Sequence, residues 1–224
     1  KAMRLLVINP NTNTSSTERM VGTARDVASP GTVVDGATAP FGVASIESPA
    51  DADIAADAIR SMLSEEPVRQ ADAVIIAAFS EPGLEAARDS LEGSALALGI
   101  AQAAIHEASA LGRFAIVTLG ATHKRSIEDA VNRYGASENF AEVVTLPWSV
   151  HEVSKHPQDF VDVFRDACAE CIATNGLHAV IVGGGPLTSI ATAVAGQVAV
   201  PVIDGVAAAV RKAERVLRTE TQTT

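Results

Sequence analysis

The chain has 224 residues, of which 47% are hydrophobic and 20% charged, and its 27 acidic against 17 basic residues give a formal net charge of −10. No run of Lys and Arg appears, which argues against nucleic acid or an anionic membrane as a partner, because both bind through clustered basic residues. No stretch approaches the ~20 uninterrupted apolar residues of a membrane span, so we expect no membrane partner.

The first half of the chain alternates short apolar runs with helical patterns. Strands are expected at residues 4–9, 33–39, 73–76 and 96–100. Ser and Thr in the polar loop after the first strand are favoured N-caps, and we predict a helix from Glu18 to about Ala28. Further helices are expected from Asp51 onward, after the P-G-L segment of residues 82–84, and at residues 102–110. This alternation is typical of α/β proteins with parallel sheets.

The second half repeats the alternation. Strands are expected at residues 114–119, 143–147 and 179–182, with a further short strand before the last helix. A helix at residues 125–134 should end at Gly135, which suits a C-cap. Residues 148–157 are the least regular part, and they fit either a flap or an exposed loop. The last helix, from about Gly205 to Thr219, should pack back on the first lobe.

Several segments of the two halves match in the same order. Residues 71–84 and 177–190 align without a gap, so that Ala78 falls on Gly184, and both copies read as a buried strand ending in small residues. The alternative to a true duplication is a loose similarity of the kind that any chain of alternating strands and helices shows between its segments. We expect two similar α/β/α lobes with parallel four-stranded sheets, related by a pseudo-twofold and comprising residues 1–110 plus 206–224 and residues 111–205. The active site should lie in the cleft between them.

Two cysteines, Cys168 and Cys171, have C-x-x-C spacing in a segment with helical periodicity. No second pair and no His cluster completes a zinc site, so we expect reduced thiols and no metal. With no signal-peptide pattern at the start, the expected compartment is the cytoplasm. The glycines of residues 183–185 lack the spacing of a dinucleotide or phosphate-binding motif, so no cofactor is expected.

The loop after the first strand carries Asn11 and Thr12 just ahead of a predicted helix. A helix N-terminus presents unpaired amides to an anion, so these residues are candidates for holding a carboxylate or imide, with simple capping as the alternative.

The motifs INPNT (8–12), SIES (45–48) and F-x-x-P-G-L (79–84), together with the duplicated plan, resemble the aspartate/glutamate/hydantoin racemase superfamily, closest to its hydantoin and allantoin racemase branch. The resemblance covers nearly the whole chain. It implies a substrate held between two lobes and a Cα proton moved by two cysteines, one from each lobe.

The two family cysteines would fall at Ala78 and Gly184, and neither residue can carry a proton. Either the chain diverged naturally from the family, or the cysteines were replaced deliberately. Deliberate replacement explains Ala78 more readily than Gly184, which lies between Gly183 and Gly185. A cysteine could be restored at Gly184 without strain only if its φ is negative.

Other residues near the strand ends must then supply the chemistry. His123 suits proton transfer at neutral pH, with a surface role as the alternative. Glu47 is a candidate acid in a loop expected near the cleft, and Ser80 is a candidate oxyanion-binding or catalytic hydroxyl. Glu81 is expected to cap the next helix. Candidate substrate-binding residues are Asn11, Thr12, Phe79, Ser80, Thr122, Gly185 and Thr188.

These observations predict a cofactor-independent enzyme, expected to be a homo-oligomer, that acts at the α-carbon of a small hydantoin-like or carboxylate substrate. The leading reaction is racemisation or isomerisation with acid–base groups other than cysteine. The alternatives are a lyase or hydrolase that uses the same oxyanion-binding loops, or a silent small-molecule binding protein.

Overall fold

A computed structural model of the chain describes residues 2–223, which fold into two four-stranded sheets. Neighbouring strands are parallel throughout, and the strand orders β2-β1-β3-β4 and β6-β5-β7-β8 are equivalent. The strands are β1 (Arg4–Asn9), β2 (Val33–Thr38), β3 (Ala73–Ile76), β4 (Leu96–Gly99), β5 (Phe114–Leu119), β6 (Phe140–Leu146), β7 (Ala179–Val182) and β8 (Val202–Asp204). The predicted α/β class with two parallel sheets is confirmed, and the aligned repeats become the equivalent strands β3 and β7.

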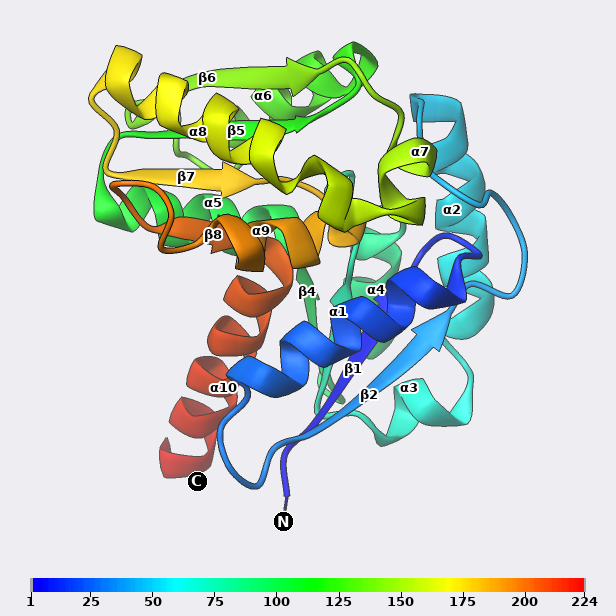
Figure 1. Cartoon of the computed structure of the whole chain (residues 1–224). Helices are drawn as coiled ribbons and strands as arrows, with labels where there is room; N and C mark the ends of the chain where they lie inside the picture. The colour runs from blue at the N-terminus through cyan, green and yellow to red at the C-terminus, as the bar shows by residue number, and fades with distance from the viewer. Residues whose placement is uncertain (1, 224) are drawn as a thin grey trace.

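Helices cover both faces of the first sheet (Figure 1). One face carries α1 (Thr14–Val27) and the end of the chain, α10 (Gly205–Thr223). The other carries α2 (Pro49–Met62) and α4 (Leu84–Leu91), with the short α3 (Glu66–Gln70) leading into β3. Because both faces are covered, β3 is buried at every position, as a continuous apolar run predicts.

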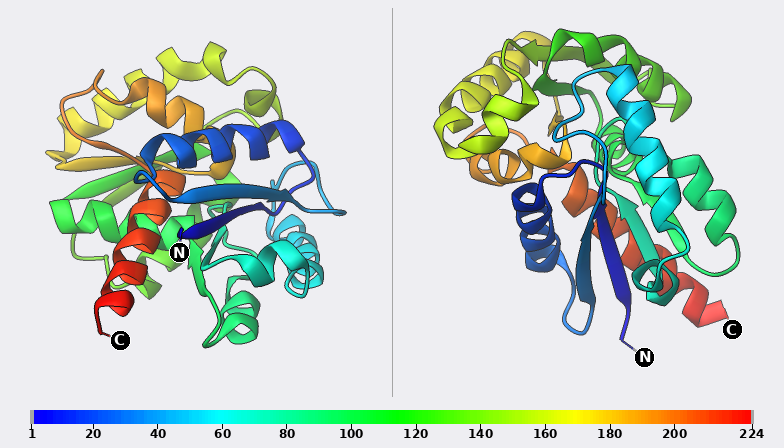
Figure 2. Two further views of the ribbon diagram at one scale, coloured as in Figure 1. Left: turned by 90° about the horizontal axis from the view of Figure 1, so that it is seen from below. Right: turned by 90° about the vertical axis from the view of Figure 1, so that its right-hand side faces the viewer.

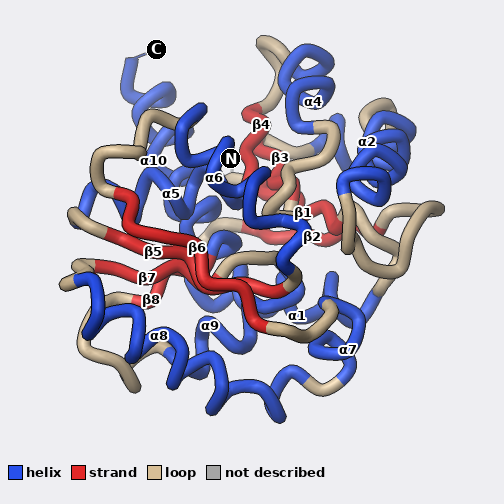
Figure 3. Tube along the Cα trace, turned by 90° about the horizontal axis from the view of Figure 1, so that it is seen from above, coloured by secondary structure: helices blue, strands red, loops and turns tan. Residues whose placement is uncertain are grey.

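The second sheet is covered in the same way, with α5 (Ile100–Leu111) and α6 (Lys124–Arg133) on one face (Figure 3). The other face carries α8 (Val161–Asn175) and α9 (Thr188–Val194). Short helical turns complete the loops, namely η1 (Ala121–His123), α7 (Val150–Lys155), η2 (Pro157–Phe160) and η3 (Gly185–Leu187). Among the described residues, no helix is long and apolar enough to cross a membrane.

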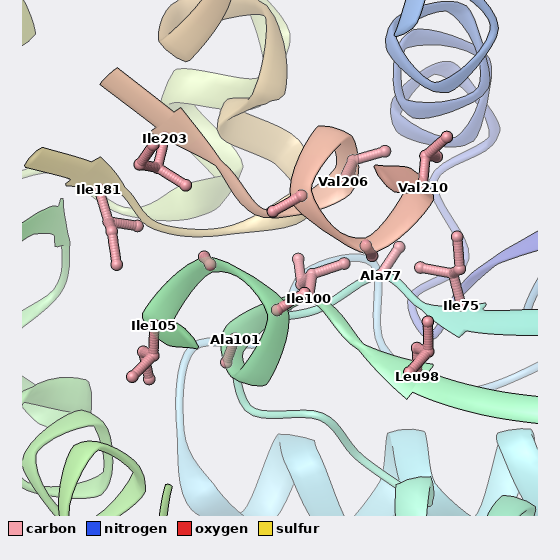
Figure 4. Close-up of a cluster of buried hydrophobic side chains, with 14 of the residues drawn as sticks. Ile75, Ala77, Leu98, Ile100, Ala101, Ile105, Ile181, Ile203, Val206 and Val210 are labelled. Atoms are coloured by element: carbon pink, nitrogen blue, oxygen red, sulfur yellow. The ribbon is translucent and has the colours of Figure 1, made fainter. Parts of the chain in front are cut away.

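The two lobes share one hydrophobic core, which α5 and α10 form by crossing between the sheets (Figure 4). Ile75 of the first sheet and Ile181 of the second belong to this single cluster, together with Ile100 of α5 and Val206 of α10. Fully burying one such side chain contributes about 1.5–3 kcal/mol to folding. The lobes are therefore held at a set orientation, and α10 returns to the first lobe, where it packs beside α1, β3 and β4 (Figure 2). The division into residues 1–110 plus 206–224 and 111–205 stays a prediction.

The predicted start of α1 is wrong, and the segment expected as a flap or exposed loop is more regular than the sequence suggested. Helix α1 begins at Thr14, well before Glu18, because Asn13 is its N-cap and accepts a hydrogen bond from the Ser16 amide. Residues 148–157 contain α7, whose Ser149 and Glu152 form a reciprocal capping box. The Ser-x-x-Glu spacing that is typical of a capping box is present in the sequence.

Candidate active site

A cavity of about 270 Å³ lies between the two lobes, where the strands of both sheets end. Its lining comes from the loops after β1, β3, β5 and β7, from the start of α2 and from one face of α6. Residues at the carboxyl ends of parallel strands are where such sheets bind ligands. The cavity is therefore the candidate active site.

Seven of the residues singled out from the sequence line this cavity. Ala78 and Gly184, the two positions aligned with the family cysteines, are both among them. The others are Asn11, Phe79, Ser80, His123 and Gly185.

Asn11 is 4% exposed, and a hydrogen-bond network sets the direction of its amide group. The Asn9 Nδ2 and the Asn13 backbone amide both donate to Asn11 Oδ1, at 2.8 and 2.9 Å. The acceptor end is therefore occupied, while Asn11 Nδ2 donates to no other described residue. A carbonyl oxygen in the cavity would satisfy it.

Backbone amides at the strand ends add further donors. Within the described residues, the amides of Phe79, Ser80, Gly184 and Gly185 have no hydrogen-bond acceptor. Unpaired backbone donors beside a cavity are free to hydrogen-bond an oxygen of a ligand. The site thus offers an oxyanion pocket built from both lobes.

Gly184 has a φ of 115°, in the region that side chains with a Cβ rarely adopt. The condition for restoring a cysteine here without strain is therefore not met. Ala78 has no such restriction, because among the described residues Glu81 is the one residue other than glycine with a positive φ. The loop after β7 has a conformation that suits glycine rather than cysteine at this position.

His123 lies at the end of η1 and precedes α6, with its side chain lining the cavity. Its ring makes no hydrogen bond with any other described residue. Both ring nitrogens are therefore available to a ligand. Imidazole is the side chain best suited to exchange protons near neutral pH.

Glu47 does not line the cavity, although the sequence suggested a catalytic carboxyl group there. Its Oε1 accepts hydrogen bonds from Ser45 Oγ at 2.6 Å and from the His151 amide at 2.9 Å, and its Oε2 accepts one from the Val150 amide at 3.2 Å. The carboxylate of a first-lobe loop thus caps α7 of the second lobe. The geometry gives Glu47 a structural role.

Two threonines predicted to bind substrate also lie outside the cavity lining and hold loops instead. Thr12 donates from its backbone amide and its hydroxyl to the Val43 carbonyl, at 2.9 and 3.3 Å. Thr122 donates to the Glu47 carbonyl at 2.9 Å, across the two lobes. Together with the hydrogen bonds of the Glu47 carboxylate, these bonds position the loop that contains Ile46 and Ser48. Both of these residues line the cavity.

Thr188, the third predicted substrate-binding threonine, is fully buried and donates to Asp204 Oδ2 at 2.9 Å. Asp204 lies at the end of β8, and its Oδ2 also accepts a hydrogen bond from the Ala207 amide of α10 at 3.0 Å. Its other oxygen, Oδ1, is buried without a partner among the described residues. Burial raises the pKa of Asp204 to about 6, partly offset by these donors.

This carboxyl group makes the protein's stability depend on pH. Because the pKa in the folded state lies above the ordinary 3.8, the folded chain binds the proton more tightly, and stability falls as pH rises from about 4 to about 6. The difference corresponds to about 3 kcal/mol. Urea unfolding of the wild type and of Asp204→Asn at about pH 4 and about pH 7, on either side of the pI of 4.9, measures this contribution. An equal difference between the two proteins at both pH values would contradict it.

Glu81 lines the cavity, but it does not cap the following helix as the sequence suggested. Its Oε1 accepts a hydrogen bond from the Gln102 amide in α5 at 2.8 Å, and its Oε2 accepts one from the Tyr134 hydroxyl. Burial raises the pKa of this carboxyl group, while the Tyr134 and Gln102 hydrogen bonds oppose the rise. Glu81 therefore caps α5 and ties the loop after β3 to the second lobe.

Sequence reasoning missed the helical walls of the cavity. Five of the lining residues that it did not single out as site residues are Ile46, Asp53, Ser126, Arg133 and Val150. His123 immediately precedes α6, and its spacing from Ser126 and Arg133 places these two residues on the side of the helix that continues from His123, which could have identified them. The described residues contain no group of three or more His, Cys, Asp or Glu that could hold a metal ion.

A model of the Asp/Glu/hydantoin racemase family matches residues 5–213. The hydantoin racemase of Pseudomonas sp. (strain NS671) is 29% identical over 96% of this chain and 86% of that protein. The hydantoin racemase of Rhizobium meliloti is 31% identical over 96% and 89%. The solved structure of an allantoin racemase from Klebsiella pneumoniae has a TM-score of 0.90 and 32% identity, covering 97% of this chain and 89% of that one.

Proposed function

This chain belongs to the Asp/Glu/hydantoin racemase family, and on that premise we propose that it is an isomerase acting at the α-carbon of a small hydantoin-like or carboxylate substrate. The resemblance indicated by the INPNT, SIES and F-x-x-P-G-L motifs is confirmed. Relatives named hydantoin and allantoin racemases support a cyclic or open ureide as the substrate.

One observation carries the proposal: unpaired donors from both lobes line the same cavity as an imidazole. Asn11 Nδ2 and the free amides after β3 and β7 provide the donors, and His123 provides the proton-transfer group. Donors fixed before the reaction stabilise an enolate oxygen without having to reorganise. This arrangement suits removal of a proton next to a carbonyl group.

In the proposed reaction, His123 takes the proton from the α-carbon, and the C–H electron pair becomes an enolate whose oxygen is held by Asn11 and the amides. Ser80 then donates a proton to the opposite face of the planar carbon. Ser80 and His123 belong to opposite lobes and both line the cavity, which supports this division of roles. Solvent takes the proton from His123 and returns one to Ser80, so both groups end as they began.

This chemistry needs no cofactor, because the carbonyl group beside the α-carbon takes up the negative charge itself. The roles assigned to His123 and Ser80 replace the two cysteines that the family resemblance implies at Ala78 and Gly184. Non-cysteine catalysis is thus the main difference that we propose between this chain and the two-cysteine members of the family.

Proton exchange in deuterated water tests the proposal. Single enantiomers of allantoin, of alkyl hydantoins, of aspartate and of glutamate are incubated with the protein, and NMR follows deuterium at the α-carbon while polarimetry follows optical rotation. We expect deuterium incorporation together with loss of rotation for at least one ureide. Ligand binding without exchange for any of these compounds would reject the isomerase and leave a binding, lyase or hydrolase role.

We also propose that the protein works in the cytoplasm and forms a homo-oligomer. The two cysteines, Cys168 and Cys171, are buried thiols that are not joined in a disulfide, which suits a reducing compartment. The exposed side chains of Phe41 and Ile54 support association of subunits. Light scattering on the purified protein measures the oligomeric state.

A further inference from the structure

One wall of the cavity is a single face of α6. His123, Ser126, Ile127, Ala130 and Arg133 all line it, and their spacing of three or four residues places them in one stripe. Ten residues of helix span about 15 Å at about 1.5 Å per residue. The cavity therefore follows α6 from the proposed proton-transfer group at one end to a guanidinium group at the other.

The guanidinium group of Arg133 forms no direct ion pair with a described carboxyl group, although it is near enough to Glu81 to oppose the rise that burial causes in the pKa of that carboxyl group. It makes no hydrogen bond or ion pair with any other described residue, and its Cζ lies 5.4 Å from the centroid of the Tyr134 ring. That ring is itself packed edge-on against His106 and hydrogen-bonded to Glu81. An aromatic face attracts and orients a cation without neutralising it. Arg133 is thus an exposed residue of the cavity lining whose donors bind no other described residue.

Neither of the two carboxyl groups in the cavity lining forms a direct ion pair with Arg133. Glu81 also lines the cavity, but both of its oxygens accept hydrogen bonds from other protein groups, and its burial disfavours the charged form. Asp53 of α2 is the other carboxyl group in the lining, and it forms no ion pair with Arg133. Between His123 and Arg133, the α6 wall is formed mainly by Ile127 and Ala130.

We propose that Arg133 is a specificity-determining residue that binds a carboxylate carried by the substituent of the substrate's α-carbon. The substrate class is then a hydantoin or related ureide with an acidic substituent. The inference rests on the proposed function for the position of the ring beside Asn11 and His123. From there the chain of the substituent would lie along Ile127 and Ala130, and the planar guanidinium would donate paired hydrogen bonds to the carboxylate.

Calorimetric binding tests this with three hydantoins that differ only in the substituent: carboxyethyl, its neutral carbamoylethyl isostere, and cationic aminobutyl. Wild type should bind the carboxyethyl compound about tenfold or more tightly than the isostere, as expected for a charge-assisted hydrogen bond. Arg133→Gln should remove that preference, and Arg133→Lys should keep part of it. The matched control is Arg125→Gln, on the same helix but outside the cavity lining, which should leave the preference unchanged.

Equal affinity for the acid and the isostere in wild type would overturn the inference, as would a preference that survives Arg133→Gln. Tightest binding of the aminobutyl compound, lost in Asp53→Asn, would also overturn it by assigning selectivity to the acid on α2. Proton exchange is measured separately on the same compounds. Preferential binding of the carboxyethyl compound without proton exchange would reject the proposed reaction while supporting the role of Arg133. Proton exchange without that preference would support the reaction and reject the role of Arg133.

Discussion

Asparagine in place of His123 should lower the rate of α-proton exchange by about 10²–10⁴-fold, the usual contribution of a positioned general base. The imidazole lines the cavity and makes no hydrogen bond with another described residue, so its loss removes the proposed proton acceptor without breaking a hydrogen bond within the protein. Asparagine keeps a polar side chain of similar size but cannot take up a proton. NMR of deuterium incorporation into a ureide enantiomer measures the effect, and calorimetry checks that binding remains.

Three further variants make this result specific. Ser80→Ala should retain exchange but slow the loss of optical rotation, because only protonation of the opposite face is impaired. Glu47→Gln should lower thermal stability and leave more exchange than His123→Asn, since its carboxylate caps α7. His156→Asn, an exposed histidine outside the cavity lining, should behave as wild type. Wild-type exchange rates in His123→Asn would assign proton transfer to another group.

Alanine in place of Gly185 should destabilise the protein by about 3 kcal/mol or more, at the upper end of what overpacking costs. A Cβ added there would lie 2.1 Å from the Ala77 carbonyl oxygen and 2.6 Å from Met20 Sδ. Ala77 follows β3 and Met20 belongs to α1, so both obstacles lie in the first lobe while Gly185 lies in the second. The added methyl group therefore has to push the lobes apart beside the cavity. For a chain of this size, we expect a Tm lower by about 6–12 °C.

Gly183→Ala is the matched control, because it also lines the cavity in the same loop. Its Cβ would make ordinary contacts of 3.4 to 3.5 Å with Ile116 and the Phe79 ring, and its φ is not in the left-handed region. We expect a loss of stability below about 1 kcal/mol. Calorimetric melting of both variants compares them, and equal destabilisation would show that the approach of Gly185 to Ala77 does not limit the packing of the lobes.

The fold was predictable because local patterns and tertiary structure agree in it. Continuous apolar runs such as 73–76 and 179–182 are typical of strands covered on both faces, and their alignment indicated a duplicated plan. The structure contains two equivalent sheets and places both strand ends at one cavity. The same reasoning misplaced the start of α1 and missed α7, since helix ends depend on which side chain reaches a backbone amide.

The candidate site was predicted only in part. Residues at strand ends, such as Asn11, Ser80 and His123, do meet at the cavity, because parallel strands place their carboxyl ends together. Glu47 and Thr188 sit in equally polar loops, but their side chains are used by α7 and by Asp204. Nothing in the sequence indicates whether these side chains bind a ligand or another part of the protein, since their hydrogen-bond partners are 16 to 104 residues away.

The three glycines after β7, residues 183–185, mark the limit of what can be predicted from the sequence alone. By itself it determined two parallel α/β lobes, a shared site at their strand ends and the absence of cysteine at Ala78 and Gly184. Only the tertiary structure decided that Gly184 requires a φ of 115° and that Gly185 must lack a Cβ because Ala77 of the other lobe approaches it. It also decided that Arg133 faces the cavity unpaired. Periodicity reports which face of an element is buried, whereas close approach and ion pairing depend on how distant elements pack together.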